Sequence, residues 1–257
     1  MSNQPISVPG DRAKAQKEQA NGLGSRRVRV WDLPLRLFHW TLVAAIAVAF
    51  LSAEENSILS EWHVFAGWLA GILIVFRLVW GFVGGEHSRF SDFIRPSRIP
   101  NHISGLLHGR READLGHNPL GAVAVVILLA LAAATVWTGA FGGEAAEELH
   151  EIIGWTLLTM VALHVIAVVA MSLIERENLT RAMITGDKLA HRHPGAVDAR
   201  PPRVFGLFLA LIVIVGAAYA IFRYDPRAFT LRTAEAFEHR ADGGAGEIRV
   251  EQDDEHD

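Results

Sequence analysis

Four histidines lie in or at the ends of strongly apolar stretches of this sequence: His39, His63, His150 and His164. An imidazole can carry a proton or bind a metal through a ring nitrogen. Within a membrane segment an ionisable side chain is costly, so it predicts a functional site. His150 and His164 bracket "HEIIGWTLLTMVALH" and are fourteen residues apart. That interval is close to four helical turns, so both imidazoles would project from nearly the same helix face.

The apolar stretches around these histidines are long enough to cross a membrane. A helix needs about 20 residues to span the hydrocarbon core. Blocks of about this length predict five transmembrane helices at residues 37–53, 62–83, 119–141, 149–174 and 204–222. For the short first block, which follows basic residues and ends in Leu-Ser-Ala, a cleaved signal peptide is the alternative.

Basic residues alternate between the stretches that separate these blocks. Lys and Arg occur in residues 1–36, 84–118 and 175–203, and both are absent from the short loops 54–61 and 142–148. The positive-inside rule therefore predicts a multi-pass membrane protein with its N-terminus in the cytoplasm and its C-terminus on the opposite side. The net charge of −4 favours no nucleic-acid partner.

Depth sorts the four histidines into two layers. His150 lies at the outer end of the fourth block, and His164 lies about 21 Å further in, at a rise of 1.5 Å per residue. The first block runs outward with His39 near its inner end, whereas the second runs inward with His63 at its outer start. The outer layer thus holds His63 and His150, and the inner layer holds His39 and His164.

Two histidines per layer narrow the choice of cofactor. The chain has no cysteine, which excludes thiolate metal sites and the attachment of a c-type haem. Zinc asks the protein for three or four ligands, whereas haem brings four equatorial nitrogens and asks only for axial ones. One b-type haem in each layer therefore fits the residues.

Two glycines are candidates for contact with the outer haem. His63 and His150 each begin a His-x-x-x-Gly-Trp run, which places Gly67 and Gly154 one turn deeper on the same face. The missing side chain would leave room for a porphyrin edge. For Gly67 a small-residue packing face shared with Gly71 is the alternative.

Two arginines lie at the depth of the inner layer. Arg77 follows His63 by fourteen residues, and Arg36 lies one turn before His39. Each could pair with a haem propionate, because Arg binds carboxylates bidentately, or could simply extend to the membrane interface. The remaining histidines are expected to be solvated surface residues: His87, His102, His108, His117, His191, His193, His239 and His256.

The run "VRVWDLPLRLFHW" (residues 28–40), His63, and the pair His150 and His164 together resemble the bacterial cytochrome b561 and nickel–iron hydrogenase b-type cytochrome family. The resemblance covers residues 28–188. It implies an all-α membrane protein whose four-helix bundle binds two haems b, each held by two histidines. It also implies electron transfer between the quinone pool and a redox partner.

The remaining segments extend this four-helix core. We expect a polar cytoplasmic arm at residues 1–27, a cytoplasmic linker at 189–203, a fifth transmembrane helix at 204–222 and a partly disordered, acidic periplasmic tail at 223–257. The tail is either a solvated extension or a docking arm for a basic periplasmic protein.

Four functions remain open at this stage. Three involve electron transfer: delivery from a periplasmic dehydrogenase or hydrogenase to quinone, quinol oxidation that feeds a c-type cytochrome, and an enzyme in which superoxide meets the outer haem. The fourth is a haem-free transporter whose histidines relay protons or metal ions. The third block offers only Thr135 and Thr138 as polar side chains, which disfavours a transport path.

Overall fold

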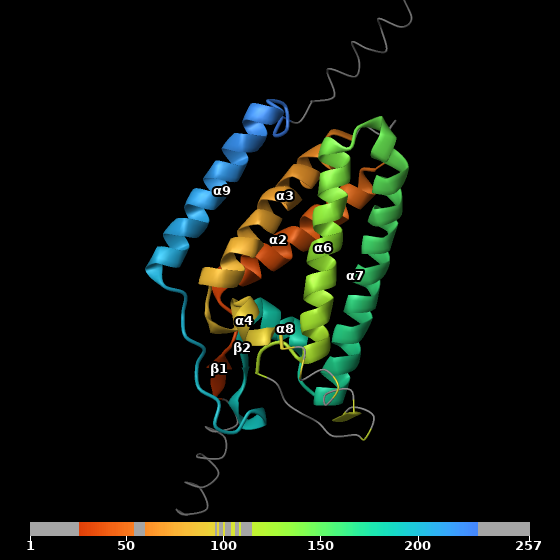
Figure 1. Ribbon diagram of the computed structural model, residues 1–257. Coiled ribbons are helices and arrows are strands. Elements are labelled where there is room, and N and C mark those ends of the chain that lie inside the picture. Colours follow the sequence, from red (N-terminus) through yellow and green to blue (C-terminus); the bar gives the residue numbers. More distant parts are fainter. Residues whose placement is uncertain are drawn as a thin grey trace, which may run out of the picture.

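Five long apolar helices dominate the computed structural model of this chain (Figure 1). The structure describes residues 26–53, 60–95 and 115–230, with a few isolated positions between 97 and 108. The five helices are α2 (Leu33–Leu51), α3 (Ser60–Val83), α6 (Pro119–Phe141), α7 (Glu147–Glu175) and α9 (Val204–Tyr224). The expected all-α fold with five candidate membrane spans is confirmed. Residues 1–25 and 231–257, which include most of the predicted arm and tail, lie outside the described residues.

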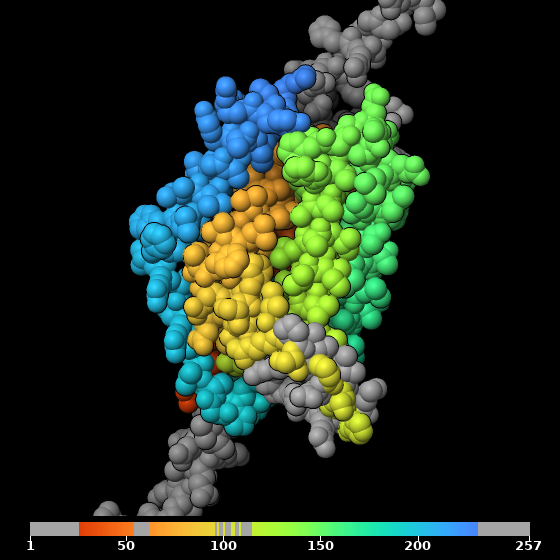
Figure 2. All heavy atoms as spheres, viewed as in Figure 1, coloured from red at the N-terminus to blue at the C-terminus, as the bar shows by residue number. Residues whose placement is uncertain are grey.

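Helix α3 is the centre of the arrangement. It packs against α2, α6 and α9, and α6 in turn packs along α7 (Figure 1). Figure 2 shows α9 on one side of α3 and the pair α6 and α7 on the other. Most apolar side chains of α6, α7 and α9 face outward, as expected for helices that contact lipid.

Helix α2 begins four residues before the apolar block that predicted it. The Asp32 carboxylate caps the helix by accepting a hydrogen bond of 2.8 Å from the backbone N–H of Leu35, and Pro34 lies in the first turn. Aspartate at the N-cap and proline in the first turn both favour a helix start. Helix α6 begins in the same way, with Asn118 as its cap.

Short elements gather at one end of the bundle, and we call them the cap (Figure 1). Strand β1 (Arg27–Arg29) pairs antiparallel with β2 (Asp187–Leu189). Around this pair lie η1 (Glu86–Ser88), α4 (Phe90–Phe93), α8 (Leu179–Thr185) and η4 (Ala190–Arg192). The cap therefore closes the end of the bundle where α2 and α6 begin and α3 and α7 end.

The expected linker at residues 189–203 is held against the cap. The N–H of Ala199 donates to Arg29 O over 2.9 Å, and the N–H of Glu86 donates to Arg200 O over 3.1 Å. A buried apolar cluster joins the cap to the helices through Trp31, Phe38 and Trp80. Segments far apart in the sequence thus form one continuous base beneath α2, α3 and α9.

Candidate functional site

The outer candidate site is formed by His63 of α3 and His150 of α7. Both lie near the end of the bundle opposite the cap. Their ring centres are 6.0 Å apart, and the ring planes cross at 78°. The two imidazoles therefore lie opposite each other across a short interval.

Hydrogen bonds to backbone carbonyls determine which ring nitrogen of each histidine carries the proton. His63 Nδ1 lies 2.8 Å from Ala49 O, and His150 Nδ1 lies 3.0 Å from Thr135 O. A carbonyl oxygen can only accept, so each Nδ1 carries the proton and each Nε2 keeps a free lone pair. Neither Nε2 has a hydrogen-bond partner among the described residues. Both rings are thus prepared to bind a metal through Nε2.

The spacing of the pair suits a metal with two axial imidazoles. A metal–imidazole nitrogen bond is about 2 Å long, so two such ligands on opposite sides of one ion place their ring centres about 6 Å apart. No group of three or more His, Cys, Asp or Glu side chains that could hold a metal occurs within the described residues. The donor set therefore fits a haem, which supplies its own equatorial nitrogens, better than zinc.

Helix α6 makes room for the His150 ring. A Cβ atom on Gly139 would lie 2.7 Å from His150 Cε1, which is closer than any real contact allows. The hydroxyl of Thr138 also lies 3.2 Å from His150 Nδ1. Sequence reasoning missed Gly139, because nothing in a uniformly apolar helix marks which small residue faces the ligand.

The glycines of α3 and α7 differ in their surroundings. A Cβ on Gly71 would lie 3.3 Å from Val136 Cγ1, so Gly71 lies at the packed contact between α3 and α6. A Cβ on Gly67 would meet nothing within 4 Å, and one on Gly154 would meet only Phe50 Cζ at 3.9 Å. Helix packing therefore accounts for Gly71, and the predicted contact of Gly67 and Gly154 with a haem stays a prediction.

The inner candidate site contains His39 of α2 and His164 of α7. Both rings are half-buried, and they lie within electrostatic range of each other. They are nearer to the cap than the outer pair, because His39 lies in the first half of α2 and His164 in the second half of α7. His164 also lies within electrostatic range of His117, so the assignment of His39 and His164 to one haem stays a prediction.

Arg77 is buried beneath the cap, with 2% of its surface exposed. Its Nη1 donates to Ser88 O over 3.1 Å, and the guanidinium lies 4.7 Å from the centre of the Phe90 ring. Arg36 donates from Nη2 to Ile184 O. Both arginines therefore have protein partners in the cap, and pairing of Arg77 with a propionate stays a prediction.

Asp32 is the main polar junction between the cap and the helices. Besides capping α2, its carboxylate accepts hydrogen bonds from Trp80 Nε1 at 3.1 Å, Gly85 N at 3.0 Å and Ser88 Oγ at 2.5 Å. A single side chain thereby joins α2, α3 and η1. These distant partners could not be predicted from the sequence.

Two histidines expected to be solvated are instead enclosed by the cap, so that expectation was wrong: His193 is buried and His117 is half-buried. The His117 ring lies between Trp31 and Phe93, at 4.7 and 4.5 Å between ring centres, and its Nδ1 is buried without a partner in the described part of the chain. Burial, with smaller contributions from Arg77 and Lys188, lowers the pKa of His117 to about 3. His193 is also buried, and its Nε2 lies 3.0 Å from Glu177 Oε2.

Comparison with known proteins decides what kind of protein presents this site. The model of the prokaryotic cytochrome b561 family matches residues 30–186, which is more than half of the chain. The chain belongs to the prokaryotic cytochrome b561 family. This membership confirms the resemblance found in the sequence. As a cytochrome b561, the protein is a multi-pass membrane protein that holds b-type haem and carries electrons.

Curated relatives of this cytochrome b561 carry a related name. A probable Ni/Fe-hydrogenase B-type cytochrome subunit of Bradyrhizobium diazoefficiens is 23% identical over 237 residues, covering 72% of this chain and 96% of the relative. A protein of the same name from Azotobacter chroococcum is 24% identical, covering 66% and 95%. The probable Ni/Fe-hydrogenase 1 B-type cytochrome subunit of Escherichia coli K12 is 28% identical over 122 residues, covering 37% and 52%. No solved structure matches the chain.

Proposed function

We propose that this cytochrome b561 holds two haems b and passes electrons across the inner membrane between the quinone pool and a periplasmic redox partner. His63 and His150 would hold the outer haem, and His39 and His164 would hold the inner haem. The observation that carries the proposal is the outer pair, whose rings lie 6.0 Å apart with both Nδ1 atoms bonded to carbonyls.

The residues of the chain prepare the ligands and limit the chemistry. The carbonyls of Ala49 and Thr135 hold each outer imidazole in the tautomer with a free Nε2, and they raise its basicity as a ligand. Haem supplies a reversible one-electron couple when it is bound. Because the chain would supply two histidines to each haem, this ligand set would favour electron transfer over binding of a substrate at the iron.

Helix α7 gives the two haems a fixed relation. It supplies one ligand to each layer, and the fourteen residues between His150 and His164 separate the layers by about 21 Å along the helix. An electron could therefore pass between two haems, one nearer the end opposite the cap and one nearer the cap. Quinone would exchange electrons with one of the haems, and the periplasmic partner would exchange electrons with the outer haem.

The names of the relatives guide the choice of partner. Those proteins are called hydrogenase cytochrome subunits, so we propose a hydrogenase or another periplasmic dehydrogenase as the first candidate, and a c-type cytochrome as the second. The family membership disfavours the haem-free transporter. An acidic tail beyond residue 230, which lies outside the described residues, would suit a basic periplasmic partner.

A visible spectrum of the purified, dithionite-reduced protein tests the cofactor. We expect a b-type α-band and, from the pyridine haemochrome, about two haems per chain, because two pairs of axial histidines are available. A colourless protein from cells well supplied with haem, or a ratio near one, would overturn the two-haem proposal.

Single substitutions test the pairing of the ligands. His39→Ala and His164→Ala should abolish the same spectral component, and His63→Ala and His150→Ala should abolish the other, since each pair shares one iron. His191→Ala is the control, because this exposed histidine lies in the cap and outside both pairs. Loss of one common component in His39→Ala and His150→Ala would contradict the pairing.

A further inference from the structure

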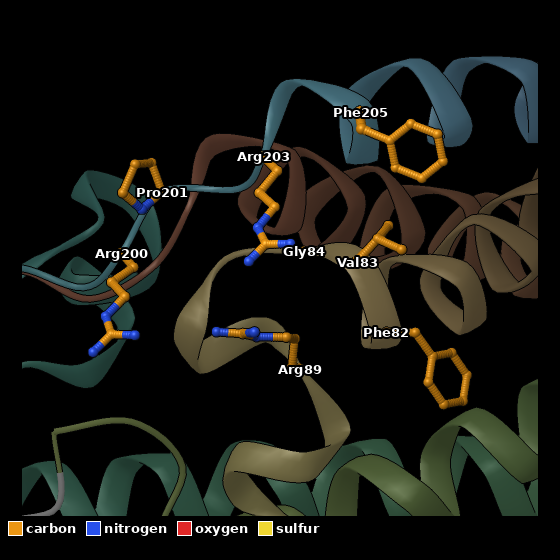
Figure 3. Close-up of a pocket in the computed structure, with 8 residues that line it drawn as sticks. All are labelled: Phe82, Val83, Gly84, Arg89, Arg200, Pro201, Arg203 and Phe205. Atoms are coloured by element: carbon orange, nitrogen blue, oxygen red, sulfur yellow. The ribbon is translucent and has the colours of Figure 1, made fainter.

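A cavity of about 470 Å³ lies where α3 ends and α9 begins. One wall is the end of α3, with Phe82, Val83 and Gly84, and the other is the segment from Arg200 to Phe205. Arg89, which follows η1, closes the base (Figure 3). The cavity is separate from both histidine pairs and lies at the end of the bundle that carries the cap.

Three guanidinium groups give this cavity a positive charge. Arg89, Arg200 and Arg203 extend into the same region (Figure 3). The side chains of Arg89 and Arg203 make no hydrogen bond or ion pair with the described residues. One acidic group is nearby: Glu86 Oε2 lies 3.9 Å from Arg200 Nε. The three cationic groups therefore outnumber the acidic one, which leaves a net positive charge at the cavity to attract an anion.

The opposite side of the cavity is apolar and faces outward. Phe82 is 74% exposed and Phe205 is 71% exposed. Figure 3 shows both rings on the helix side of the cavity, away from the guanidinium groups. Because α3 and α9 are membrane spans, this change from arginine to phenylalanine coincides with the passage from the lipid headgroups to the hydrocarbon.

The walls of the cavity are held in place by close backbone contacts. A Cβ on Gly206 would lie 2.7 Å from Val83 O, so α9 begins directly against α3. The N–H of Arg200 donates to Glu86 Oε2 over 3.0 Å, and the N–H of Glu86 donates to Arg200 O over 3.1 Å. The arginines thus project from a preformed frame, which lowers the entropic cost of binding.

We propose that this cavity binds the phosphate headgroup of an anionic glycerophospholipid, whose acyl chains lie along Phe82 and Phe205. Guanidinium groups bind phosphate bidentately, and basic pockets between membrane helices suit lipid headgroups. A free phosphate would satisfy the arginines but would leave the apolar side without a partner. The combination of charge and apolar surface therefore selects an amphiphile.

Native mass spectrometry of the full-length holoprotein tests this proposal. The protein is released from nanodiscs that contain equal amounts of phosphatidylglycerol and phosphatidylcholine, and the retained lipids are counted. We expect preferential retention of phosphatidylglycerol. In the double variant Arg89→Gln/Arg203→Gln this preference should fall by about 25-fold, at about fivefold per arginine.

A matched double variant serves as the control. Arg223→Gln/Arg227→Gln removes two exposed arginines at the other end of α9 and should retain the wild-type lipid preference. The haem spectrum of each variant verifies that the bundle is intact. Equal retention of the two lipids by the wild type, or an unchanged preference in the cavity variant, would overturn the proposal. Displacement of the bound lipid by millimolar inorganic phosphate would identify a soluble anion as the ligand and would overturn it as well.

Discussion

At the scale of single residues, the outer site depends on atoms that do not touch a metal. The carbonyls of Ala49 and Thr135 choose which nitrogen of each imidazole is free, and Gly139 makes space for one ring. A ligand can therefore be lost without any change at His63 or His150.

We expect Gly139→Ala to weaken the outer haem site while His150 itself is unchanged. The new methyl group would lie 2.7 Å from His150 Cε1, so the ring must move away from its place beside Thr135 O. The haem content should fall toward one per chain, measured by pyridine haemochrome. Gly216→Ala is the matched control, since nothing lies within 4 Å of its new methyl group. Full haem content in Gly139→Ala would show that the ring adjusts.

The half-buried imidazole of His117, packed between Trp31 and Phe93, makes stability depend on pH. Its pKa falls from the usual 6.5 to about 3 in the folded protein. Between these values the unfolded chain binds a proton that the folded chain does not, so stability is complete above about pH 6.5 and declines as the pH falls. At pH 5 the loss from this group is on the order of 2 kcal/mol.

His117→Phe removes this titration and keeps an aromatic ring between Trp31 and Phe93. We expect the melting temperature of the variant in detergent to fall less between pH 7.5 and pH 5 than that of the wild type. His191→Ala, at an exposed position in η4, should follow the wild type. Parallel curves for His117→Phe and the wild type would refute the assignment.

At the scale of elements, Asp32 makes several of the polar contacts that join the cap to the helices. Asp32→Ala removes the N-cap hydrogen bond of helix α2. It also leaves the donors of Trp80, Gly85 and Ser88 without an acceptor. A lost helix cap costs about 1 kcal/mol, and each partly buried donor left unsatisfied adds about 1 kcal/mol or more. With one cap and three donors, the total should be about 4 kcal/mol or more.

Asn118→Ala provides the comparison for Asp32→Ala. It removes the N-cap of helix α6, which is a single hydrogen bond from the N–H of Gly121, and should lower the free energy of unfolding by about 1 kcal/mol. Thermal unfolding of both variants measures the difference. An Asp32→Ala variant no less stable than Asn118→Ala would show that the cap does not depend on this carboxylate.

The elements also show which features of the fold were predictable. Apolar blocks of about 20 residues identified five helices, because the membrane imposes a length that few other structures need. The start of α2 was placed too late, since Asp32 and Pro34 begin a helix without being apolar. Strands β1 and β2 gave no signal, because each has three residues and its partner lies about 160 residues away.

The site was predictable only in part, for similar reasons. The four histidines could be chosen and grouped by depth, because membrane helices are straight and rise by a constant amount per residue. The burial of His117 depends on how Trp31 and Phe93 fold back over it, and the role of Gly139 depends on which face of α6 meets α7. Neither relation is local in the sequence.

At the scale of the whole molecule, the alternating charges predict an orientation in the membrane. The cap carries the arginine-rich segments and should lie in the cytoplasm, whereas α9 should deliver the C-terminus to the periplasm. Alkaline phosphatase fused after Thr230 should be active, and the same enzyme fused after Lys188 should be inactive. Activities in the reverse order would show that the protein has the opposite orientation and that the layer called outer faces the cytoplasm.

The position of both α7 histidines on one helix also constrains how the sequence can change over time. Each inserted or deleted residue between His150 and His164 would turn one imidazole by about 100° relative to the other and shift it by 1.5 Å. Substitutions in the interval leave that relation intact, and many of its side chains face outward. The outward-facing residues of the segment are therefore free to vary in identity, whereas the number of residues in the segment is not free to vary.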